Sequence, residues 1–236
     1  MPSNPDRRPL IVLAVPDETR ALLKLARARW GSAAMGKSIQ RGEQGKEIRV
    51  GPLRILTTGM GQRQAELSIR ASIDAERPVW LVTGGFTGGL NPALKLADLI
   101  WDADPNFPAR AWLEHTGGVR GTFHCHPTIA ATARSKEELH RTTGADAVEM
   151  ESGVIRSICS KLGIPSATLR VISDTADADM PLDFNRITTP DLRLDPLKLA
   201  LEILKAPQKI PRLIRFQGEI ARAAQTLAEQ LVKAPI

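Results

Sequence analysis

The sequence contains no tyrosine and few aromatic residues of any kind, with five phenylalanines and four tryptophans among 236 residues. Proteins that bind single-stranded nucleic acids stack the bases on aromatic side chains interleaved with basic ones, and the sequence has no such run. Lysine and arginine outnumber aspartate and glutamate by 32 to 26, but the excess is spread thinly. We therefore expect no nucleic-acid partner, and interpret the net charge of +6 as a solvated surface that helps to attract anionic metabolites.

Cysteine and long apolar runs are also scarce. The two cysteines, Cys125 and Cys159, are too few for a disulfide framework. No stretch reaches the roughly 18 apolar residues of a membrane span, and the opening MPSNPDRRP lacks the apolar centre of a signal peptide. We expect a reducing, cytoplasmic location.

No internal repeat or Ser/Gly-rich linker divides the chain, so we expect one domain over residues 1–236. Short apolar runs alternate with helical patterns through the first 175 residues, which predicts an α/β sheet with helices on both faces. Strands are expected at 9–15, 47–50, 53–58, 78–83 and 166–172. Helices are expected around 21–26, at 64–75, from 148, at 196–205 and at 211–233.

The segment TGGFTGGL, residues 83–90, is the most glycine-rich part of the chain, and we expect it to form a turn after the strand at 78–83. It lacks the Gly-Lys-Ser/Thr of a phosphate-binding P-loop and the glycine spacing of a dinucleotide fingerprint. The residues leave two interpretations equally open, a ligand-binding loop and a tight structural turn.

Charged residues stand at two unusual places. Glu149, Met150 and Glu151 open a predicted helix, where stabilisation by the helix dipole is the simpler explanation for the carboxylates. Arg170 lies inside a strand whose apolar residues predict that it is buried, and Asp174 follows at the end of that strand. A buried arginine with an aspartate at the strand end is a stronger functional signal, with a structural ion pair as the alternative.

Three neighbouring residues, His124, Cys125 and His126, have the residue types of a metal site. In an extended segment only the two histidines share a face, so only two ligands converge. We expect neither a metal nor a cofactor.

The run VEMESGVIRSICSKLGIPSATLRVISDTAD, residues 148–177, resembles the signature region of the nucleoside phosphorylase/nucleosidase superfamily. Its members include purine nucleoside phosphorylases and 5′-methylthioadenosine/S-adenosylhomocysteine nucleosidases. The segments LAVPDETR, TTGMG and TGGFTGGL resemble further elements of that family, so the similar pieces extend over about residues 10–180. The resemblance implies a three-layer αβα sandwich with a central mixed sheet, followed by C-terminal helices over 194–236.

The tail KAPQKIPRLIRFQGEIARAAQTL, with VPDETR and VEMES, is most similar to the subgroup of hopanoid-associated phosphorylases, thought to release adenine from adenosylhopane. This narrower resemblance implies a purine nucleoside substrate of the adenine type and a place in hopanoid biosynthesis. The family resemblance also implies a homo-oligomer, because a neighbouring subunit completes the pocket in relatives.

The resemblance assigns the sugar-binding residues. Glu151 would accept hydrogen bonds from the ribose 2′- and 3′-hydroxyls, and Met150 would pack against the sugar. Glu18 would hold the attacking water or the region of the 3′-hydroxyl. Further substrate contacts are implied at Glu149, Gly85, Phe86 and the backbone of residues 127–129, which includes Ile129.

The resemblance makes Asp174 the general acid toward the purine, with Ser173 and Arg170 orienting it. Cleavage of the glycosidic bond builds negative charge on the leaving base, and protonation of the base relieves that charge. Asp174 must then be protonated part of the time, and we expect burial and the nearby Asp177 and Asp179 to favour the protonated form.

Two residues depart from the pattern of the purine nucleoside phosphorylases. Those enzymes hold phosphate with an arginine in the strand and a serine in the glycine-rich segment, where this chain has Thr83 and Phe86. Water is therefore the expected nucleophile. Phosphorolysis, with inorganic phosphate as co-substrate, is the alternative, and a nucleoside-binding protein without turnover is the third hypothesis.

The tail carries leucines and isoleucines at helical spacing with lysines and arginines between them. Either its apolar faces pack on the domain or on a second subunit, or the helices rest on an anionic membrane surface. The second interpretation would suit a lipid-linked nucleoside.

Overall fold

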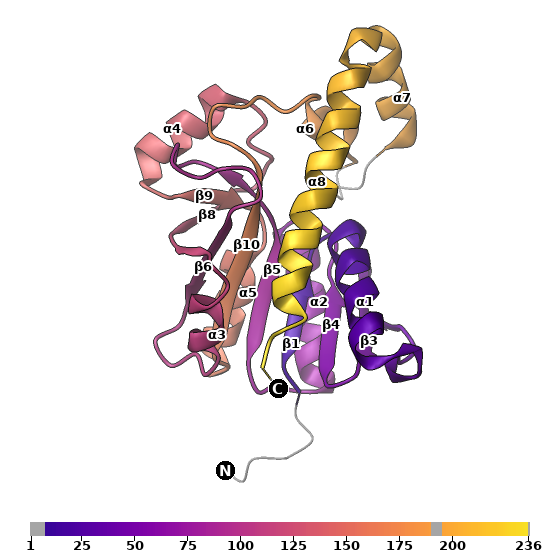
Figure 1. Ribbon diagram of the computed structural model, residues 1–236, viewed down its shortest axis with the longest axis vertical. Coiled ribbons are helices and arrows are strands. Elements are labelled where there is room, and N and C mark those ends of the chain that lie inside the picture. Colours follow the sequence, from indigo (N-terminus) through magenta and orange to yellow (C-terminus); the bar gives the residue numbers. More distant parts are fainter. Residues whose placement is uncertain (1–7, 190–194, 236) are drawn as a thin grey trace.

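Every residue of the strand β1, Leu10–Leu13, is buried, because helices cover both faces of the sheet. The computed structural model describes residues 8–189 and 195–235 (Figure 1). Ile11 and Leu13 belong to a core cluster that includes residues of α1 (Pro16–Trp30) and α8 (Ile210–Leu231). Leu10 and Val12 point the other way, toward α2 (Gln62–Ala75) and α5 (Ser152–Lys161).

The sheet runs in the order β2-β3-β4-β1-β5-β10-β6-β7, with β9 pairing β5 and β8 pairing β9. Strands β4, β1, β5 and β10 are parallel neighbours, whereas β10 pairs with β6 in the antiparallel sense. The α/β fold with a central mixed sheet is therefore confirmed. The remaining strands are β2 (Ile39–Arg41), β3 (Gly45–Val50), β4 (Leu53–Thr57), β5 (Leu81–Gly89), β6 (Leu99–Ala103), β7 (Val119–Arg120), β8 (Phe123–Cys125), β9 (Ala147–Glu149) and β10 (Ser166–Asp174). The other helices are α3 (Arg110–Glu114), α4 (Ala133–Thr143), α6 (Phe184–Ile187) and α7 (Pro196–Lys205), with short 3₁₀ turns at Ser32–Ala34 and Pro207–Lys209.

The expected glycine-rich turn at 83–90 is wrong, because TGGFTGGL continues β5 as regular strand up to Gly89. The strand pairs with β10 in parallel along this stretch, and Gly85 lies opposite Arg170. A side chain at Gly85, which has a φ of +140°, would place its Cβ 2.5 Å from the Arg170 guanidinium and 2.7 Å from the Glu18 carboxylate. The glycine therefore serves close packing between strands and site residues, which a turn pattern in the sequence does not reveal.

Other predicted elements are confirmed with shifted ends. The hairpin of β3 and β4 and the helix α2 lie where the sequence places them, while the strand expected from residue 78 begins at Leu81. The helix expected from residue 148 begins only at Ser152, because residues 147–149 form β9, which pairs with β5 and β8.

The C-terminal helices divide into a packed part and a projecting part. Ala223, Leu227 and Leu231 of α8 are buried in the core, so packing on the domain is confirmed for that half of the helix. The other end of α8 projects beyond the sheet together with α7 (Figure 1), and none of the described residues of α7 is buried. Leu194 and Ile236, the ends of the predicted tail, lie outside the described residues. In the described part of the chain, no helix is both long enough and apolar enough to cross a membrane.

Substituting Gly85 tests the close packing of β5. Gly85→Ala is expected to lower the free energy of unfolding by about 1–3 kcal/mol, because the new Cβ collides with two buried charged groups. Gly218→Ala in α8 is the matched control, since nothing lies within 4 Å of its Cβ and alanine favours helix by up to about 1 kcal/mol. Urea unfolding of both variants measures the difference, and equal stability of the two would contradict the packing explanation.

Candidate active site

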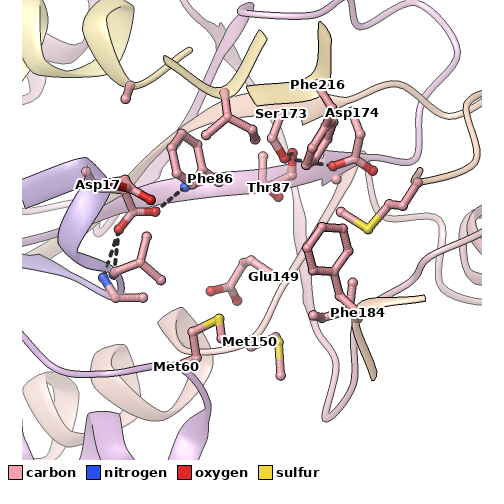
Figure 2. A pocket seen from close by; sticks show the side chains of 18 of the residues that line it. Asp17, Met60, Phe86, Thr87, Glu149, Met150, Ser173, Asp174, Phe184 and Phe216 are labelled. Carbon is pink, nitrogen blue, oxygen red and sulfur yellow. Dashed lines mark hydrogen bonds between the residues drawn. The ribbon is translucent and has the colours of Figure 1, made fainter. Parts of the chain in front are cut away.

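A cavity of about 680 Å³ opens where the carboxyl ends of β1, β5 and β10 meet (Figure 2). Ligand sites of α/β sheets form at such strand ends, and small-molecule sites commonly span about 300–1,000 Å³. The residues around the cavity come from β9, α6 and α8 as well as from these strand ends and the first turn of α1. The predicted Glu18, Glu151, Arg170 and Asp174 all line it.

Glu18 is held by three backbone amides. Its Oε2 accepts hydrogen bonds from the amides of Ala14 and Val15, each at 3.0 Å, and its Oε1 accepts one from Phe86 at 2.8 Å. A glutamate in the first turn of a helix reaches back to the amide before that helix, which explains two of these contacts. Burial raises the pKa of Glu18, against the opposing effects of Arg170 and the three amides. The carboxylate is thus fixed at the cavity wall.

Arg170 is buried in the middle of β10 and pairs with two glutamates. Its Nη2 lies 2.6 Å from Oε2 of Glu149 and 3.5 Å from Oε2 of Glu151. The prediction that Arg170 orients Asp174 is wrong. Asp174 lies four residues further along the strand, roughly 13 Å at 3.3 Å per residue, and the glutamates at the start of α5 are within reach instead. Arg170 therefore holds the two glutamates in the wall of the cavity.

Glu149 caps the start of α5. Its Oε2 accepts hydrogen bonds from the amides of Glu151 (2.9 Å) and Ser152 (2.7 Å), and its Oε1 accepts one from the Ser152 hydroxyl at 2.7 Å. The helix-terminus explanation is therefore confirmed for this carboxylate. Together with the Arg170 contact, these bonds occupy both oxygens, and the direct substrate contact expected of Glu149 stays a prediction.

Glu151 is less fully bonded and lines the cavity. Its Oε1 accepts a hydrogen bond from the Gly61 amide at 2.8 Å, and its Oε2 has only the longer contact to Arg170. Burial, helped by the neighbouring Glu149 and Glu18 charges and opposed by Arg170, raises the pKa of Glu151 to about 7. Met150 and Met60 also line the cavity and lie below Glu149 in Figure 2.

Asp174 lies on a separate part of the cavity wall. Its Oδ1 accepts a hydrogen bond from the Ser173 hydroxyl at 2.7 Å, the contact that the sequence predicts. Its Oδ2 forms an ion pair with Lys136, a fully buried lysine of α4 that the sequence analysis missed. Asp177 and Asp179, expected beside Asp174, bond instead to the Thr175 hydroxyl and the Ala133 amide.

An apolar wall, absent from the sequence-based site, faces the charged residues. Phe184 of α6 and Phe216 of α8 lie with ring centroids 5.9 Å apart and line the same cavity as Asp174 (Figure 2). Leu213 and Ile220 of α8 continue this wall. The helical spacing of 213, 216 and 220 was visible in the sequence, but nothing in it indicated that this stripe faces a cavity.

The other residues predicted to contact the substrate are Ile129, Phe86 and Gly85. Ile129 lines the cavity, but its amide and carbonyl are both bonded to the side chain of Asn185, at 3.0 and 2.9 Å. These backbone groups are therefore occupied in this structure. Phe86 lines the cavity, and its backbone amide donates a hydrogen bond to Glu18. Gly85 has no side chain, which lets Arg170 and Glu18 approach each other. The substrate contacts of these residues stay predictions.

The histidine pair does not belong to a larger ligand cluster. His124 and His126 have ring centroids 5.5 Å apart, as expected for alternate residues of an extended segment. In residues 8–189 and 195–235 no group of three or more His, Cys, Asp or Glu side chains is placed to hold a metal ion. Burial raises the pKa of the Cys125 thiol to about 12, so it is no ready nucleophile.

Comparison with known sequences supports the resemblance of the signature region. The family model described as Phosphorylase superfamily matches residues 118–205. The 5′-methylthioadenosine/S-adenosylhomocysteine nucleosidases of Mycobacterium bovis and Mycobacterium tuberculosis are 45% identical over 53 residues, which is 22% of this chain. The match covers about a fifth (21%) of the length of these curated relatives.

Solved structures share the fold over nearly the whole chain. The futalosine hydrolase of Helicobacter pylori matches with a TM-score of 0.69 and 20% identity, covering 97% of both chains. The 5′-methylthioadenosine/S-adenosylhomocysteine nucleosidase of the same organism, solved with butyl-thio-DADMe-Immucillin-A, matches with a TM-score of 0.69 and 19% identity, covering 95% of this chain and 96% of that one. The nucleosidase of Campylobacter jejuni has a TM-score of 0.68 and 16% identity, with 96% and 97% covered. At these identities the likeness shows the fold.

The raised pKa of Glu151 predicts a pH-dependent stability. The folded protein binds the Glu151 proton up to about pH 7 and the unfolded chain only up to about 4.5, so the stability of the folded state falls as pH rises between these values. Glu151→Gln removes this effect and keeps an acceptor for the Gly61 amide. It is expected to be more stable than the unmodified protein by about 1–3 kcal/mol near pH 8 and to lose that advantage near pH 4.5.

Urea unfolding at both pH values measures this difference. Glu137→Gln on the exposed side of α4 is the control and should show no pH-dependent difference. A Glu151→Gln protein that is no more stable near pH 8 than near pH 4.5 would show that Glu151 titrates normally.

Proposed function

We propose that this chain, a member of the nucleoside phosphorylase/nucleosidase superfamily, hydrolyses the N-glycosidic bond of an adenine-type nucleoside. The observation that carries the proposal is the division of one cavity into two charged ends. Glu18 and Glu151 surround Arg170 at one end, and Asp174 with Ser173 stands at the other. A nucleoside needs these two ends, because its sugar becomes cationic while its base becomes anionic as the bond breaks.

Each group has one task in the reaction. The water oxygen bonds to C1′ of the sugar while the C1′–N9 bond breaks and its electron pair goes to the base. Asp174 gives its proton to N7 of the purine and becomes a carboxylate, and Glu18 takes a proton from the water. Glu151 accepts hydrogen bonds from the sugar hydroxyls, and its negative charge stabilises the cationic sugar. After the products leave, Glu18 releases its proton to solvent and Asp174 takes one up.

The geometry favours water over phosphate as nucleophile. Arg170 is neutralised by Glu149, and its Nη2 also donates a hydrogen bond to the Thr83 hydroxyl oxygen at 3.3 Å. The Phe86 amide is bonded to Glu18. An anion would therefore meet carboxylates and occupied donors at this end of the cavity, which makes phosphorolysis the less favoured reaction.

The apolar wall supports a nucleoside with a large apolar substituent. Phe184, Phe216, Leu213 and Ile220 offer no charge to a substrate, yet they line the same cavity as the carboxylates. A free nucleoside would leave this wall exposed, whereas a lipid-like group on the 5′ carbon would cover it. The resemblance of the tail to the hopanoid-associated subgroup agrees with such a substrate, and we propose adenosylhopane or a similar lipid-linked adenosine.

A substrate panel tests the function. Adenosine, 5′-methylthioadenosine, inosine and a long-chain 5′-alkylthioadenosine are incubated with the protein, with and without phosphate. We expect free adenine and an unphosphorylated sugar, the lowest KM for the long-chain compound, and no acceleration by phosphate. A sugar 1-phosphate formed only when phosphate is present would establish phosphorolysis. If none of the compounds releases its base, the chain would instead be a nucleoside-binding protein without turnover.

Asp174→Asn tests the general acid. Asparagine keeps the shape and a hydrogen-bond donor but has no proton to give, so adenine release is expected to fall by about 10²–10⁴ while nucleoside binding persists. Asp177→Asn, an aspartate bonded only locally to Thr175, is the control and should keep its rate within about twofold. An Asp174→Asn protein with the rate of the unmodified enzyme would refute the assignment.

We also propose that the projecting tip, residues 196–215, rests on an anionic membrane surface. Leu197, Leu201 and Leu204 are 77%, 55% and 76% exposed, and Ile214 is 64% exposed. The basic residues of this tip are Lys198, Lys205, Lys209, Arg212 and Arg215. Each contributes roughly 1 kcal/mol near anionic lipid, and exposed leucines insert at the interface. The apolar wall of the cavity adjoins the tip through Leu213, which would bring a lipid-linked substrate close to its source.

Vesicle sedimentation tests the membrane contact. Binding to phosphatidylcholine vesicles containing phosphatidylglycerol is expected at low ionic strength and is expected to weaken with salt. The double variant Leu201→Ser with Leu204→Ser should lose about tenfold or more in affinity, while Val119→Ser, 52% exposed on β7, should not change it. If vesicles do not bind and the same double variant abolishes a dimer in solution, the tip is instead the interface of the expected homo-oligomer.

A further inference from the structure

Lys136 is one of the three largest fully buried side chains among the described residues, with Arg54 and Arg170. It sits on α4, a helix in which it is the only buried residue. A lysine is rarely buried unless its charge is paired, because removing the ammonium from water costs several kcal/mol. The helix therefore holds this cation inside the protein at a specific place.

All three hydrogens of the Lys136 ammonium have acceptors. Its Nζ forms the ion pair with Oδ2 of Asp174 and donates to the carbonyl oxygens of Thr175 at 2.8 Å and Ala178 at 2.9 Å. These acceptors are Asp174 itself and the chain that follows it. Lys136 thus fixes both the carboxyl group and the backbone on which it is carried.

The second oxygen of Asp174 has a partner that accommodates either charge state. The Ser173 hydroxyl lies 2.7 Å from Oδ1 of Asp174 and 3.2 Å from the carbonyl oxygen of Thr87. A hydroxyl has one hydrogen, so it donates to Asp174 when that group is ionised. When Asp174 carries the proton for the base on the lone pair of Oδ1 that Ser173 does not use, the Ser173 hydroxyl keeps its bond to Oδ1 or donates to the Thr87 carbonyl oxygen instead. The proton can therefore be gained and lost without breaking the arrangement.

We propose that Lys136 is the positioning residue of the general acid, holding Asp174 toward the base and stabilising the carboxylate formed when its proton leaves. This inference rests on the proposed function. As Asp174 transfers its proton to the purine, negative charge develops on the carboxyl group, and the fixed ammonium favours that charge in the transition state. No other atom is transferred in this step, and Lys136 keeps its own protons.

Three readouts separate this role from a merely structural one. Lys136→Met should lower kcat/KM for 5′-methylthioadenosine by about 10–100-fold. It should change cleavage of 4-nitrophenyl β-D-ribofuranoside by less than about threefold, because nitrophenolate leaves without a proton. In the Asp174→Asn background, Lys136→Met should cause no further loss, since it acts only through Asp174. Lys136→Arg should recover part of the activity.

Controls keep the outcomes distinct. Arg134→Met removes an exposed cation of the same helix and should leave both substrates unaffected. If Lys136→Met does not fold, Lys136→Gln, which retains donors for the two carbonyl oxygens, replaces it. Equal losses on both substrates, or losses that add to those of Asp174→Asn, would overturn the proposal. An unmodified protein that releases no base would refute the proposed function and not the role of Lys136 in holding Asp174.

Discussion

The burial of the Arg170 guanidinium is the constraint on which the rest of the site depends. A cation in the centre of β10 is tolerable only with anionic partners, and Glu149 and Glu151 supply them from the start of α5. The same need explains why β5 carries Gly85 opposite Arg170, since any side chain there would displace the guanidinium or Glu18. One buried charge thus accounts for the glycine on the neighbouring strand and for the glutamates at the start of α5.

Two cations with separate partners keep the two ends of the cavity chemically different. Arg170 pairs with Glu149 and Glu151 and Lys136 pairs with Asp174, so Asp174 and the glutamates have no ion-pair partner in common. Because Arg170 and Asp174 lie on one strand, the backbone itself sets the separation of the two ends. The pKa of Glu151 rises to about 7 chiefly through burial, so keeping this carboxylate inside the protein lowers the stability of the folded state at neutral and higher pH.

The sequence predicted what is local and missed what comes from tertiary contacts. Glu151 and Asp174 could be assigned because residues 148–177 resemble the signature region of a known family. The residues alone gave Glu151 only the simpler explanation of a carboxylate at a helix start. Lys136 could not be assigned, because a lysine in a polar helix normally indicates a solvated face. The glycine-rich segment was misread because glycine is typical both of turns and of strands that another side chain approaches closely, and only the pairing with β10 distinguishes the two.

Helix α8 joins the core, the cavity and the surface in one rigid element. At 1.5 Å per residue its 22 residues extend about 33 Å, with Leu227 and Leu231 in the core, Phe216 and Ile220 on the cavity, and Ile214 exposed at the tip. The helix begins in the projecting tip and ends packed on the strands that carry the charged residues. The place of the apolar wall relative to Asp174 is therefore set by the packing of α8 on the sheet.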